Sequence, residues 1–334
     1  MSEIYASIDV GTNSALLLIA KIEKHIVSPE MQSEPDISGK TKTLPAVTRQ
    51  RLEPCLEKLA SVRLGEDLKA ESEEITVGPQ AQSRLIKAML EFRQVIHNTG
   101  AKLMALTLTE AMRQATNQED ILHEFETIFE LHNIAPTILT GPEEALGSWV
   151  GVAHYYDKKE FVSLDIGAGS TELSTKEHRV SMPLGALRIN KAYGAVPGDS
   201  IRDWLIGQTE EVEWENYKGL PIYLCGGTAT ALAAVSLKLD YFDGKAVESY
   251  PVDYGLVKRT FMRLGDLSAE VRNKIPGLDK GRGDLIIPGL RILENYIEKL
   301  NPDVCRVTNL GLRYGILVQL LSQQNLLESP LENQ

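Results

Sequence analysis

The sequence is poor in the residues that build disulfide frameworks and metal sites. It has three cysteines, Cys55, Cys225 and Cys305, without a C-x-x-C pair, and its six histidines include no H-E-x-x-H pattern. Disulfide scaffolds and the common zinc motifs need such pairs, so both are excluded. The absence of G-x-S-x-G likewise excludes a nucleophile-elbow serine hydrolase. We expect the three cysteines to be reduced, buried thiols of a cytoplasmic protein.

Long hydrophobic runs and an excess of positive charge are also absent. The tightest apolar run, residues 15–20, is far shorter than the roughly 20 residues that cross a bilayer, and the N-terminus does not read as a signal peptide. The chain has 46 Asp+Glu against 35 Lys+Arg, a formal net charge of -11. That balance argues against a nucleic-acid coat or a binder of anionic membranes, which need basic surfaces. A small phosphorylated substrate in a locally positive site remains compatible with it.

Strand-like and helix-like segments alternate along the 334 residues. At roughly 150 residues per domain, this length predicts two domains. Expected strands are residues 4–10, 16–22, 103–108, 134–139 and 161–166; expected helices are residues 83–96, 110–115, 200–206, 229–239, 254–264, 283–300 and 311–321, with further helices capped by Asn117 and opened by Gly141-Pro142. Such alternation is typical of an α/β protein with one sheet in each half.

The polar stretch 28–54 interrupts this alternation. It contains Pro29, Pro35, Pro45 and Pro54 and shows no apolar period. A stretch of this length without periodicity is typical of an excursion from the fold. We therefore expect residues 28–54 outside the core, where they could cover the cleft or a partner surface.

One short motif occurs twice. Residues 8–14 read I-D-V-G-T-N-S and residues 164–170 read L-D-I-G-A-G-S, so Asp9 and Asp165 lie 156 positions apart (165 − 9). In each copy an apolar strand ends on Asp, a turn of small residues follows, and a second strand leads away. A Rossmann glycine loop leads into a helix instead. A single copy is commonly an ordinary hairpin, but recurrence of Asp and Ser at the same offsets favours a functional pair.

The residue types of this turn suit phosphate binding. Gly and Asn accept positive φ angles, which lets successive backbone N–H groups converge on one anion, and the Ser and Thr hydroxyls add donors. An Asp at the strand end would repel phosphate, so it is better suited to hold Mg²⁺ or a water. Two such turns, one in each half, predict a polyphosphate gripped from both sides of a closing cleft.

These motifs resemble the phosphate motifs of the actin, sugar-kinase and heat-shock ATPase superfamily, and within it the exopolyphosphatase / guanosine pentaphosphate phosphatase family. Further similar blocks are R-L-G at 63–65, T-E-A-M-R-Q-A-T-N at 109–117, P-E-E-A at 142–145, P-L-G-A-L-R at 183–188, G-T-A-T-A-L-A at 227–233, R-G-D at 282–284 and G-L-R-Y-G at 311–315. The resemblance covers nearly the whole chain. It implies the short form with two ribonuclease H-like α/β domains and a cleft between them: residues 1–141 with 312–334, and residues 142–311.

The resemblance also implies roles for individual residues. Glu144 would be the general base, whereas Glu143 is expected to be structural. Asp165, Glu172 and Asp9 would be the carboxylates associated with Mg²⁺. The implied phosphate contacts are Gly11, Thr12, Asn13, Ser14, Gly167, Ala168, Gly169, Ser170 and Thr171, with Arg113, Arg188 and Arg282 as guanidinium candidates. Gly226, Gly227 and Thr228 would form a loop on the nucleoside side, or else a helix start that needs Gly for close packing.

The implied activity is Mg²⁺-dependent hydrolysis of the terminal phosphoanhydride of inorganic polyphosphate. Guanosine pentaphosphate is the alternative substrate, and a catalytically weak regulator that binds polyphosphate or guanosine tetraphosphate is the non-enzymatic alternative. Kinase or ATPase activity rests on fold analogy alone. Because the family commonly forms homodimers, a second copy of the chain is the expected partner.

The sequence departs from the family pattern at two positions. Leu16 and Leu146 stand where family members often carry arginine. Each charge-assisted hydrogen bond contributes roughly 1.5–3 kcal/mol, so their loss predicts a modest affinity for long polyphosphate. Arg188 and Lys191 are the candidates to compensate.

Overall fold

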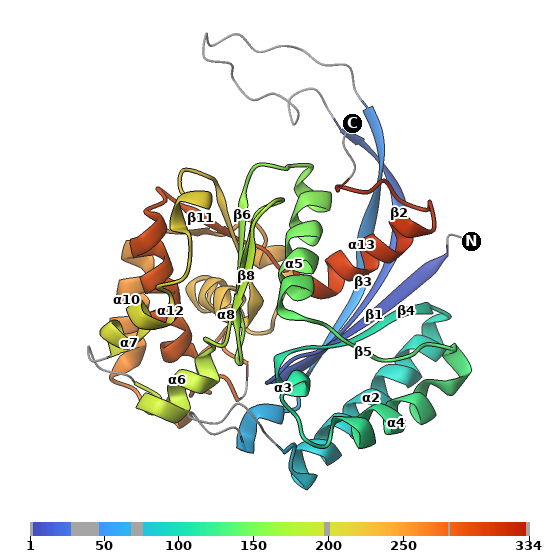
Figure 1. Ribbon diagram of the computed structural model, residues 1–334, viewed down its shortest axis with the longest axis horizontal. Helices are drawn as coiled ribbons and strands as arrows, with labels where there is room; N and C mark the ends of the chain where they lie inside the picture. The colour runs from blue at the N-terminus through green and yellow to red at the C-terminus, as the bar shows by residue number, and fades with distance from the viewer. Residues whose placement is uncertain (1–2, 28–46, 68–75, 197–200, 280, 332–334) are drawn as a thin grey trace.

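The computed structural model describes residues 3–27, 47–67, 76–196, 201–279 and 281–331. Two sheets, each flanked by helices, form two lobes (Figure 1). The first lobe consists of β1 (Ile4–Val10), β2 (Ser14–Val27), β3 (Val47–Ser61), η1 (Leu64–Asp67), α2 (Pro79–Thr99), β4 (Lys102–Leu108), α3 (Glu110–Arg113), α4 (Gln118–Phe129), η2 (Glu130–His132) and β5 (Thr137–Ile138).

The second lobe contains most of the remaining elements. They are β6 (Val162–Ile166), β7 (Thr171–Ser174), β8 (Arg179–Met182), α6 (Ala186–Tyr193), α7 (Ile201–Gln208), η3 (Trp214–Asn216), β9 (Ile222–Cys225), α8 (Gly226–Leu237), α9 (Gly244–Val247), β10 (Pro251–Val252), α10 (Tyr254–Gly265), α11 (Ala269–Arg272), α12 (Ile286–Leu300) and β11 (Cys305–Val307). Two further helices, α5 (Gly141–Tyr156) and α13 (Leu312–Gln323), lie between the two sheets (Figure 1).

The two sheets share one topology. The first has the strand order β3-β2-β1-β4-β5, and the second has β8-β7-β6-β9-β11 with β10 added at the edge. In both, the first three strands in sequence order form an antiparallel meander. Two further strands, β4 and β5 in the first sheet and β9 and β11 in the second, extend it in parallel. The repeat seen in the sequence is therefore the beginning of a repeated fold, and the predicted α/β class is confirmed. The exact domain bounds stay a prediction.

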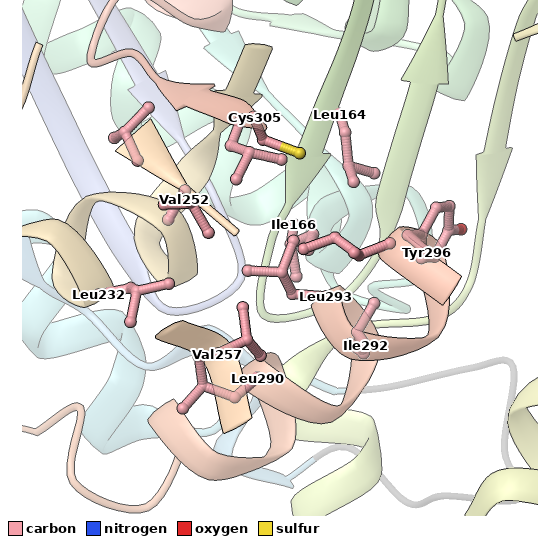
Figure 2. Close-up of a cluster of buried hydrophobic side chains, with 14 of the residues drawn as sticks. Leu164, Ile166, Leu232, Val252, Val257, Leu290, Ile292, Leu293, Tyr296 and Cys305 are labelled. Carbon is pink, nitrogen blue, oxygen red and sulfur yellow. The ribbon is translucent and has the colours of Figure 1, made fainter. Parts of the chain in front are cut away.

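The period of two along a strand decides where each repeated Asp points. In β1, Ile8 and Val10 pack into the cluster below α2 and α4, whereas the Ser7 hydroxyl faces the other way and donates to the Arg313 carbonyl of α13 at 2.7 Å. Asp9 shares the Ser7 face. In β6, the alternate residues Leu164 and Ile166 likewise join the core of the second lobe (Figure 2). Asp165 thus faces α5, as Asp9 faces α13.

Each lobe has its own hydrophobic core. In the second lobe, residues from β6, α8 and α12 pack together, among them Leu164, Leu232, Leu290 and Tyr296 (Figure 2). A third cluster, with Trp149 and Phe161 stacked at 5.3 Å between ring centroids, fills the layer around α5 and α13. This shared layer joins the lobes behind the two Asp residues.

Helices α5 and α13 cross at glycines. A methyl group on Gly315 would overlap the Gly147 carbonyl oxygen and come within 2.7 Å of the Gly151 nitrogen. Because backbone atoms cannot move aside as a flexible side chain can, this crossing requires the absence of a side chain at Gly315.

Most expected elements are present, with four differences. Residues 28–46 lie outside the described residues, but residues 47–54 are not an excursion: they belong to β3, paired with β2, and Leu52 is fully buried. Strand β5 is shorter than predicted. Asn117 precedes α4, yet its side chain bonds the backbone of Val77 (3.0 Å) instead of capping the helix. Cys225 and Cys305 are buried as expected, whereas Cys55 is exposed, because its strand lies at the sheet edge.

No helix in the described part of the chain is long and apolar enough to cross a membrane.

The glycine crossing generates a stability prediction. We expect Gly315→Ala to lower the free energy of unfolding by about 1–3 kcal/mol or more, the usual effect of overpacking. The control is Gly207→Ala, where a methyl group meets no atom within 4 Å and the better helix former should add about 0.5–1 kcal/mol. Urea unfolding of both variants measures the difference. Equal stability of Gly315→Ala and wild type would show that α5 and α13 can move apart to make room for the methyl group without a cost in stability.

Candidate active site

The two repeated turns have the same hydrogen bond. Gly11 N–H donates to the Ser14 carbonyl at 2.9 Å, and Gly167 N–H donates to the Ser170 carbonyl at 3.0 Å. Both turns therefore reverse the chain between antiparallel strands in the same way, as the sequence predicts.

Neighbouring segments occupy the carbonyls of these turns. The Asn13 carbonyl accepts from Val62 N–H at 3.0 Å, and the Ala168 carbonyl accepts from Leu187 N–H at 2.9 Å. The N–H groups of Thr12, Asn13, Ala168 and Gly169, by contrast, donate to no residue among those described. With acceptors engaged and donors free, both turns are suited to bind an anion.

The turns face each other across one cleft of about 220 Å³. A methyl group on Gly169 would overlap the Thr12 hydroxyl of the opposite turn and come within 2.9 Å of Glu110 Cγ. Of the predicted phosphate contacts, the cleft is lined by Gly11, Thr12, Asn13, Ser14, Gly167, Ala168, Gly169, Ser170 and Arg282. Thr171 does not line it, since its hydroxyl donates to the Leu184 carbonyl.

Two buried carboxylates lie behind the turns. Asp9 is 9% exposed, and its Oδ1 is buried without a hydrogen-bond partner among the described residues. Burial raises the pKa of Asp9 to about 7, with Arg313 opposing this and Asp165 adding to it. Asp165 Oδ2 accepts from the Ser148 hydroxyl of α5 at 2.8 Å, and burial raises its pKa too. Both carboxylates line the cleft.

Glu144 lies in the first turn of α5 and also lines the cleft. Its Oε2 accepts from Arg113 Nη1 at 2.8 Å. Burial raises the pKa of Glu144, while Arg113 lowers it and Asp9 and Asp165 raise it further. The neighbouring Glu143 instead accepts from the N–H and hydroxyl of Thr140 at 2.7 Å, completing a capping box. Glu143 is structural, as predicted.

Glu172 lies opposite Asp165 in the β6–β7 pair but outside the cleft. It is 2% exposed on β7, accepts from the Ser181 hydroxyl at 2.7 Å, and does not line the cleft. Burial and the charges of Glu144 and Asp165 raise its pKa. Its association with Mg²⁺ stays a prediction.

The donor set at the cleft fits Mg²⁺. That ion is usually held by one or two carboxylates, with waters and substrate phosphates as further ligands. Asp9 and Asp165 supply hard oxygens, and one of them, Asp9 Oδ1, has no described partner. A cage of three or more His, Cys, Asp or Glu side chains is absent from the described residues, so Asp9 and Asp165 suit an ion shared with substrate.

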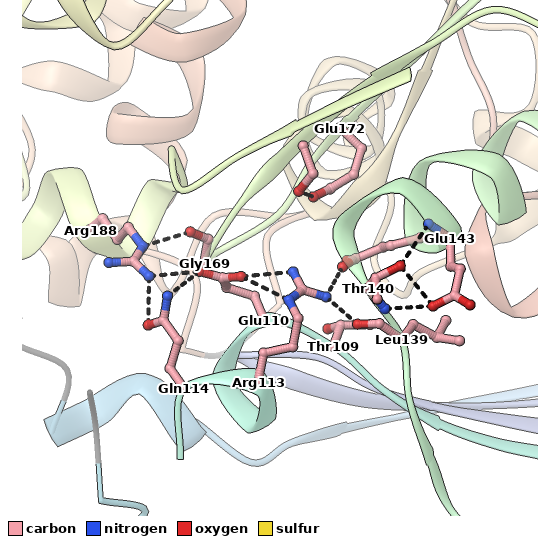
Figure 3. Close-up of polar contacts among 12 residues, drawn as sticks. Thr109, Glu110, Arg113, Gln114, Leu139, Thr140, Glu143, Gly169, Glu172 and Arg188 are labelled. Atoms are coloured by element: carbon pink, nitrogen blue, oxygen red, sulfur yellow. Dashed lines mark hydrogen bonds and ion pairs between the residues drawn. The ribbon is translucent and has the colours of Figure 1, made fainter. Parts of the chain in front are cut away.

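The three candidate arginines occupy different places. Arg282 lines the cleft, with Nε 3.5 Å from Asp279 Oδ2, and burial lowers its pKa. Arg113 and Arg188 do not line it. Their guanidinium groups instead bond Glu110 from two sides, as Figure 3 shows.

The segment Gly226 to Thr228 both opens α8 and lines the cleft. A methyl group on Gly227 would overlap the Arg282 guanidinium. The close-packing explanation therefore applies at Gly227, whereas the nucleoside-side role of this segment stays a prediction.

The cleft residues that sequence reasoning missed include three charged ones, Arg313, Glu57 and Glu110. Arg313 is 9% exposed, pairs with Glu57 and donates to Asn309 Oδ1 at 3.3 Å. Its charge lowers the pKa of both Asp9 and Asp165. Arg313 could have been found from its place in the block G-L-R-Y-G. Glu57 lies in a strand that the sequence analysis did not predict, so no local pattern indicated it.

The two departures from the family pattern lie in different surroundings. Leu16 lines the cleft, whereas Leu146 packs against the cluster of the shared helical layer. Lys191 bonds the Glu66 carbonyl and Arg188 bonds Glu110, so neither lines the cleft in place of a missing arginine.

The contact between Gly227 and Arg282 yields a prediction. We expect Gly227→Ala to displace the Arg282 guanidinium and weaken binding of inorganic tripolyphosphate by about 10-fold or more, the contribution of one charge-assisted hydrogen bond. Isothermal titration calorimetry measures the affinity. Gly265→Ala is the control, because a methyl group there meets only Val196 Cγ1 at 4.0 Å. Unchanged affinity in Gly227→Ala would remove Arg282 from the phosphate site.

Comparisons with known proteins agree with this geometry. The model of the Ppx/GppA phosphatase family matches residues 45–324. The chain is 28% identical over 324 residues to a bifunctional 3-dehydroquinate synthase/phosphatase of Fusobacterium nucleatum, covering 89% of this chain but only 44% of that protein. It is 23% identical to exopolyphosphatase 2 of Mycobacterium tuberculosis, with 88% of this chain and 90% of the relative covered.

Solved structures show the same fold. A Ppx/GppA family member from Aquifex aeolicus superposes with a TM-score of 0.71 at 24% identity, covering 97% of this chain and 99% of that one. An exopolyphosphatase from Cytophaga hutchinsonii gives a TM-score of 0.75 at 18% identity, covering 96% and 98%. The predicted actin-like ATPase fold is thereby confirmed. With the family model matching most of its length, the chain belongs to the Ppx/GppA phosphatase family.

Proposed function

We propose that the chain is a Mg²⁺-dependent exopolyphosphatase that hydrolyses the terminal phosphoanhydride of inorganic polyphosphate. The observation that carries the proposal is the cleft itself, where two turns with free N–H donors face each other beside Glu144. An acidic chain has little long-range attraction for a polyanion, so backbone N–H groups, Arg282 and Lys58 of the cleft supply the local attraction.

In the proposed reaction Glu144 accepts a proton from the attacking water. The water oxygen forms a bond to the terminal phosphorus, the bond to the bridging oxygen breaks, and the shortened chain leaves with that electron pair. The two turns hold the phosphates, and Asp9 and Asp165 would hold Mg²⁺. When bound, the metal would neutralise charge that develops on the phosphate oxygens.

A second substrate is favoured by the apolar side chains of the cleft. Leu16 and Leu59, paired across β2 and β3, line it from the first lobe, and Phe242 lines it from the second. Leu59 and Phe242 are 43% and 40% exposed. Such side chains offer nothing to a further phosphate but suit a planar base, which favours guanosine pentaphosphate as the alternative substrate or guanosine tetraphosphate as a ligand.

A homodimer and a cytoplasmic location also belong to this proposal. The first rests on the family resemblance, and the second on three cysteines that are all unpaired.

The role of Glu144 is tested by substitution. We expect Glu144→Gln to lower kcat for phosphate release from polyphosphate by about 10²- to 10⁴-fold, the usual contribution of a general base, and EDTA to abolish release by the wild type. Glu143→Gln is the matched control: glutamine can still complete the capping box with Thr140, so stability and kcat should both stay close to wild type. Equal release by Glu144→Gln and wild type would remove the residue from its role. Tight binding without release would indicate a regulator.

Substrate choice is tested at Phe242. If a base stacks there, Phe242→Ala should lower kcat/KM for guanosine pentaphosphate by about tenfold, equivalent to ~1.4 kcal/mol, with little change for polyphosphate. Tyr241→Ala is the control, because Tyr241 is 78% exposed and does not line the cleft. A parallel loss with both substrates would argue against a base at this end.

A further inference from the structure

A network of ion pairs connects the two lobes beside the cleft (Figure 3). At its centre is Glu110, the first residue of α3, which is 8% exposed. Its Oε2 accepts from Arg113 Nε and Nη2 at 3.2 and 2.7 Å, and its Oε1 accepts from Arg188 Nη2 at 2.7 Å. Arg188 belongs to α6 of the second lobe, so Glu110 joins an arginine from each lobe.

The network ends on Glu144. Besides Glu110, Arg113 bonds two groups through Nη1: Glu144 Oε2 at 2.8 Å and the Leu139 carbonyl at 2.7 Å. These contacts fix one oxygen of the Glu144 carboxylate. None of the described residues donates a hydrogen bond to the other oxygen, Oε1. One oxygen is thus anchored, and the other is available to a water.

The second end of the network holds a phosphate turn. Arg188 Nε donates to the Gly169 carbonyl at 2.8 Å, and Arg188 Nη2 also reaches Gln114 Oε1 at 2.8 Å. The Arg188 side chain therefore contacts the turn of the second lobe and α3 of the first at the same time. This contact exists only while the lobes are together.

The charges of the network balance. Two glutamates, Glu110 and Glu144, share two arginines, and the guanidinium next to Glu144 is divided between both carboxylates. Without the Glu110 carboxylate, Arg113 would lose two of its hydrogen bonds and Arg188 its ion pair across the cleft. The arginine that anchors Glu144 would then be less firmly placed, although Glu144 itself is unchanged.

We infer that Glu110 is a positioning residue for the hydrolytic reaction, which fixes Arg113 and through it Glu144 when Arg188 docks from the second lobe. The inference rests on the proposed role of Glu144 as the base. When the lobes close, the Arg188 side chain then fixes the position of the second phosphate turn and, through Glu110 and Arg113, that of the base Glu144. A misplacement of about 1 Å in such an arrangement can cost about 100-fold in rate.

The test compares full-length variants in phosphate release from polyphosphate. We expect Glu110→Gln and Arg188→Gln each to lower kcat by about 10- to 100-fold while KM stays within about threefold, because positioning acts on the transition state rather than on ground-state binding. The double variant should lose clearly less activity than the product of the two single losses, because both substitutions remove the same Glu110–Arg188 ion pair. Glu110→Asp keeps the charge and should fall between Glu110→Gln and wild type. Glu91→Gln, an exposed acid on α2, is the matched control.

A second measurement does not depend on activity. Hydrogen exchange at residues 141–146 and 167–170 is recorded with tripolyphosphate present. It should be faster in Glu110→Gln than in the wild type or Glu91→Gln. The melting temperatures of the variants are compared first, and Glu110→Asp replaces Glu110→Gln if they differ. Four outcomes would overturn the inference: a kcat of the single variants within twofold of wild type, a change confined to KM, additive losses in the double variant, or unchanged hydrogen exchange. If the wild type releases no phosphate, the proposed function fails, while the exchange experiment still tests the network.

Discussion

Four largely buried carboxylates lie in the region where the lobes meet, and burial raises the pKa of each. They belong to Asp9, Asp165, Glu144 and Glu172. Removing charged groups from water is costly unless they are paired or neutralised. The surroundings of the cleft provide partners: Ser148 donates to Asp165, Ser181 to Glu172, and Arg113 to Glu144. Asp9 Oδ1 alone among these oxygens is buried without a described partner, which makes it the position where an additional cation is best accommodated.

The same electrostatic constraint explains why so few cations line the cleft. Arg282, Arg313 and Lys58 line it, but Arg313 is paired with Glu57 and Lys58 is exposed to solvent. Arg113 and Arg188 bond carboxylates and do not line the cleft. Attraction for a polyanion therefore falls mainly on the backbone N–H groups of the two turns, whose carbonyls are bonded to neighbouring segments. A site of this type depends on precise placement of the main chain more than on net charge.

The sequence predicted the parts of the site that local chemistry determines. A strand ending in Asp, followed by small residues, identified both turns, and alternation along β1 and β6 accounts for the direction of both Asp side chains. Glu143 was expected to be structural because it lies in the first turn of a helix, and the capping box that it completes is a local pattern. These features depend on residues within a few positions of one another.

Features that depend on distant partners were not predictable in this way. Nothing local indicates that Arg188 bonds Glu110, 78 positions away, or that Leu146 packs in the shared helical layer. Residues 47–54 read as an excursion because their strand pairs only with β2 and lies at the sheet edge, where polar residues are tolerated. The exposure of Cys55 follows from the same edge position.

The common topology of the two sheets has a consequence for charge. Each half presents the same strand end, with the same acidic residue, toward the same shared layer, so duplication of the fold also duplicates its negative charge at one place. The symmetry of the fold is electrostatically unfavourable there, because the two equivalent Asp carboxylates repel each other when both are ionised. The repulsion is relieved by a side chain that is not duplicated: Arg313 of α13, which has no arginine counterpart in α5, lowers the pKa of both Asp residues. The two halves therefore differ at the point where Asp9 and Asp165 share one positive charge, that of Arg313.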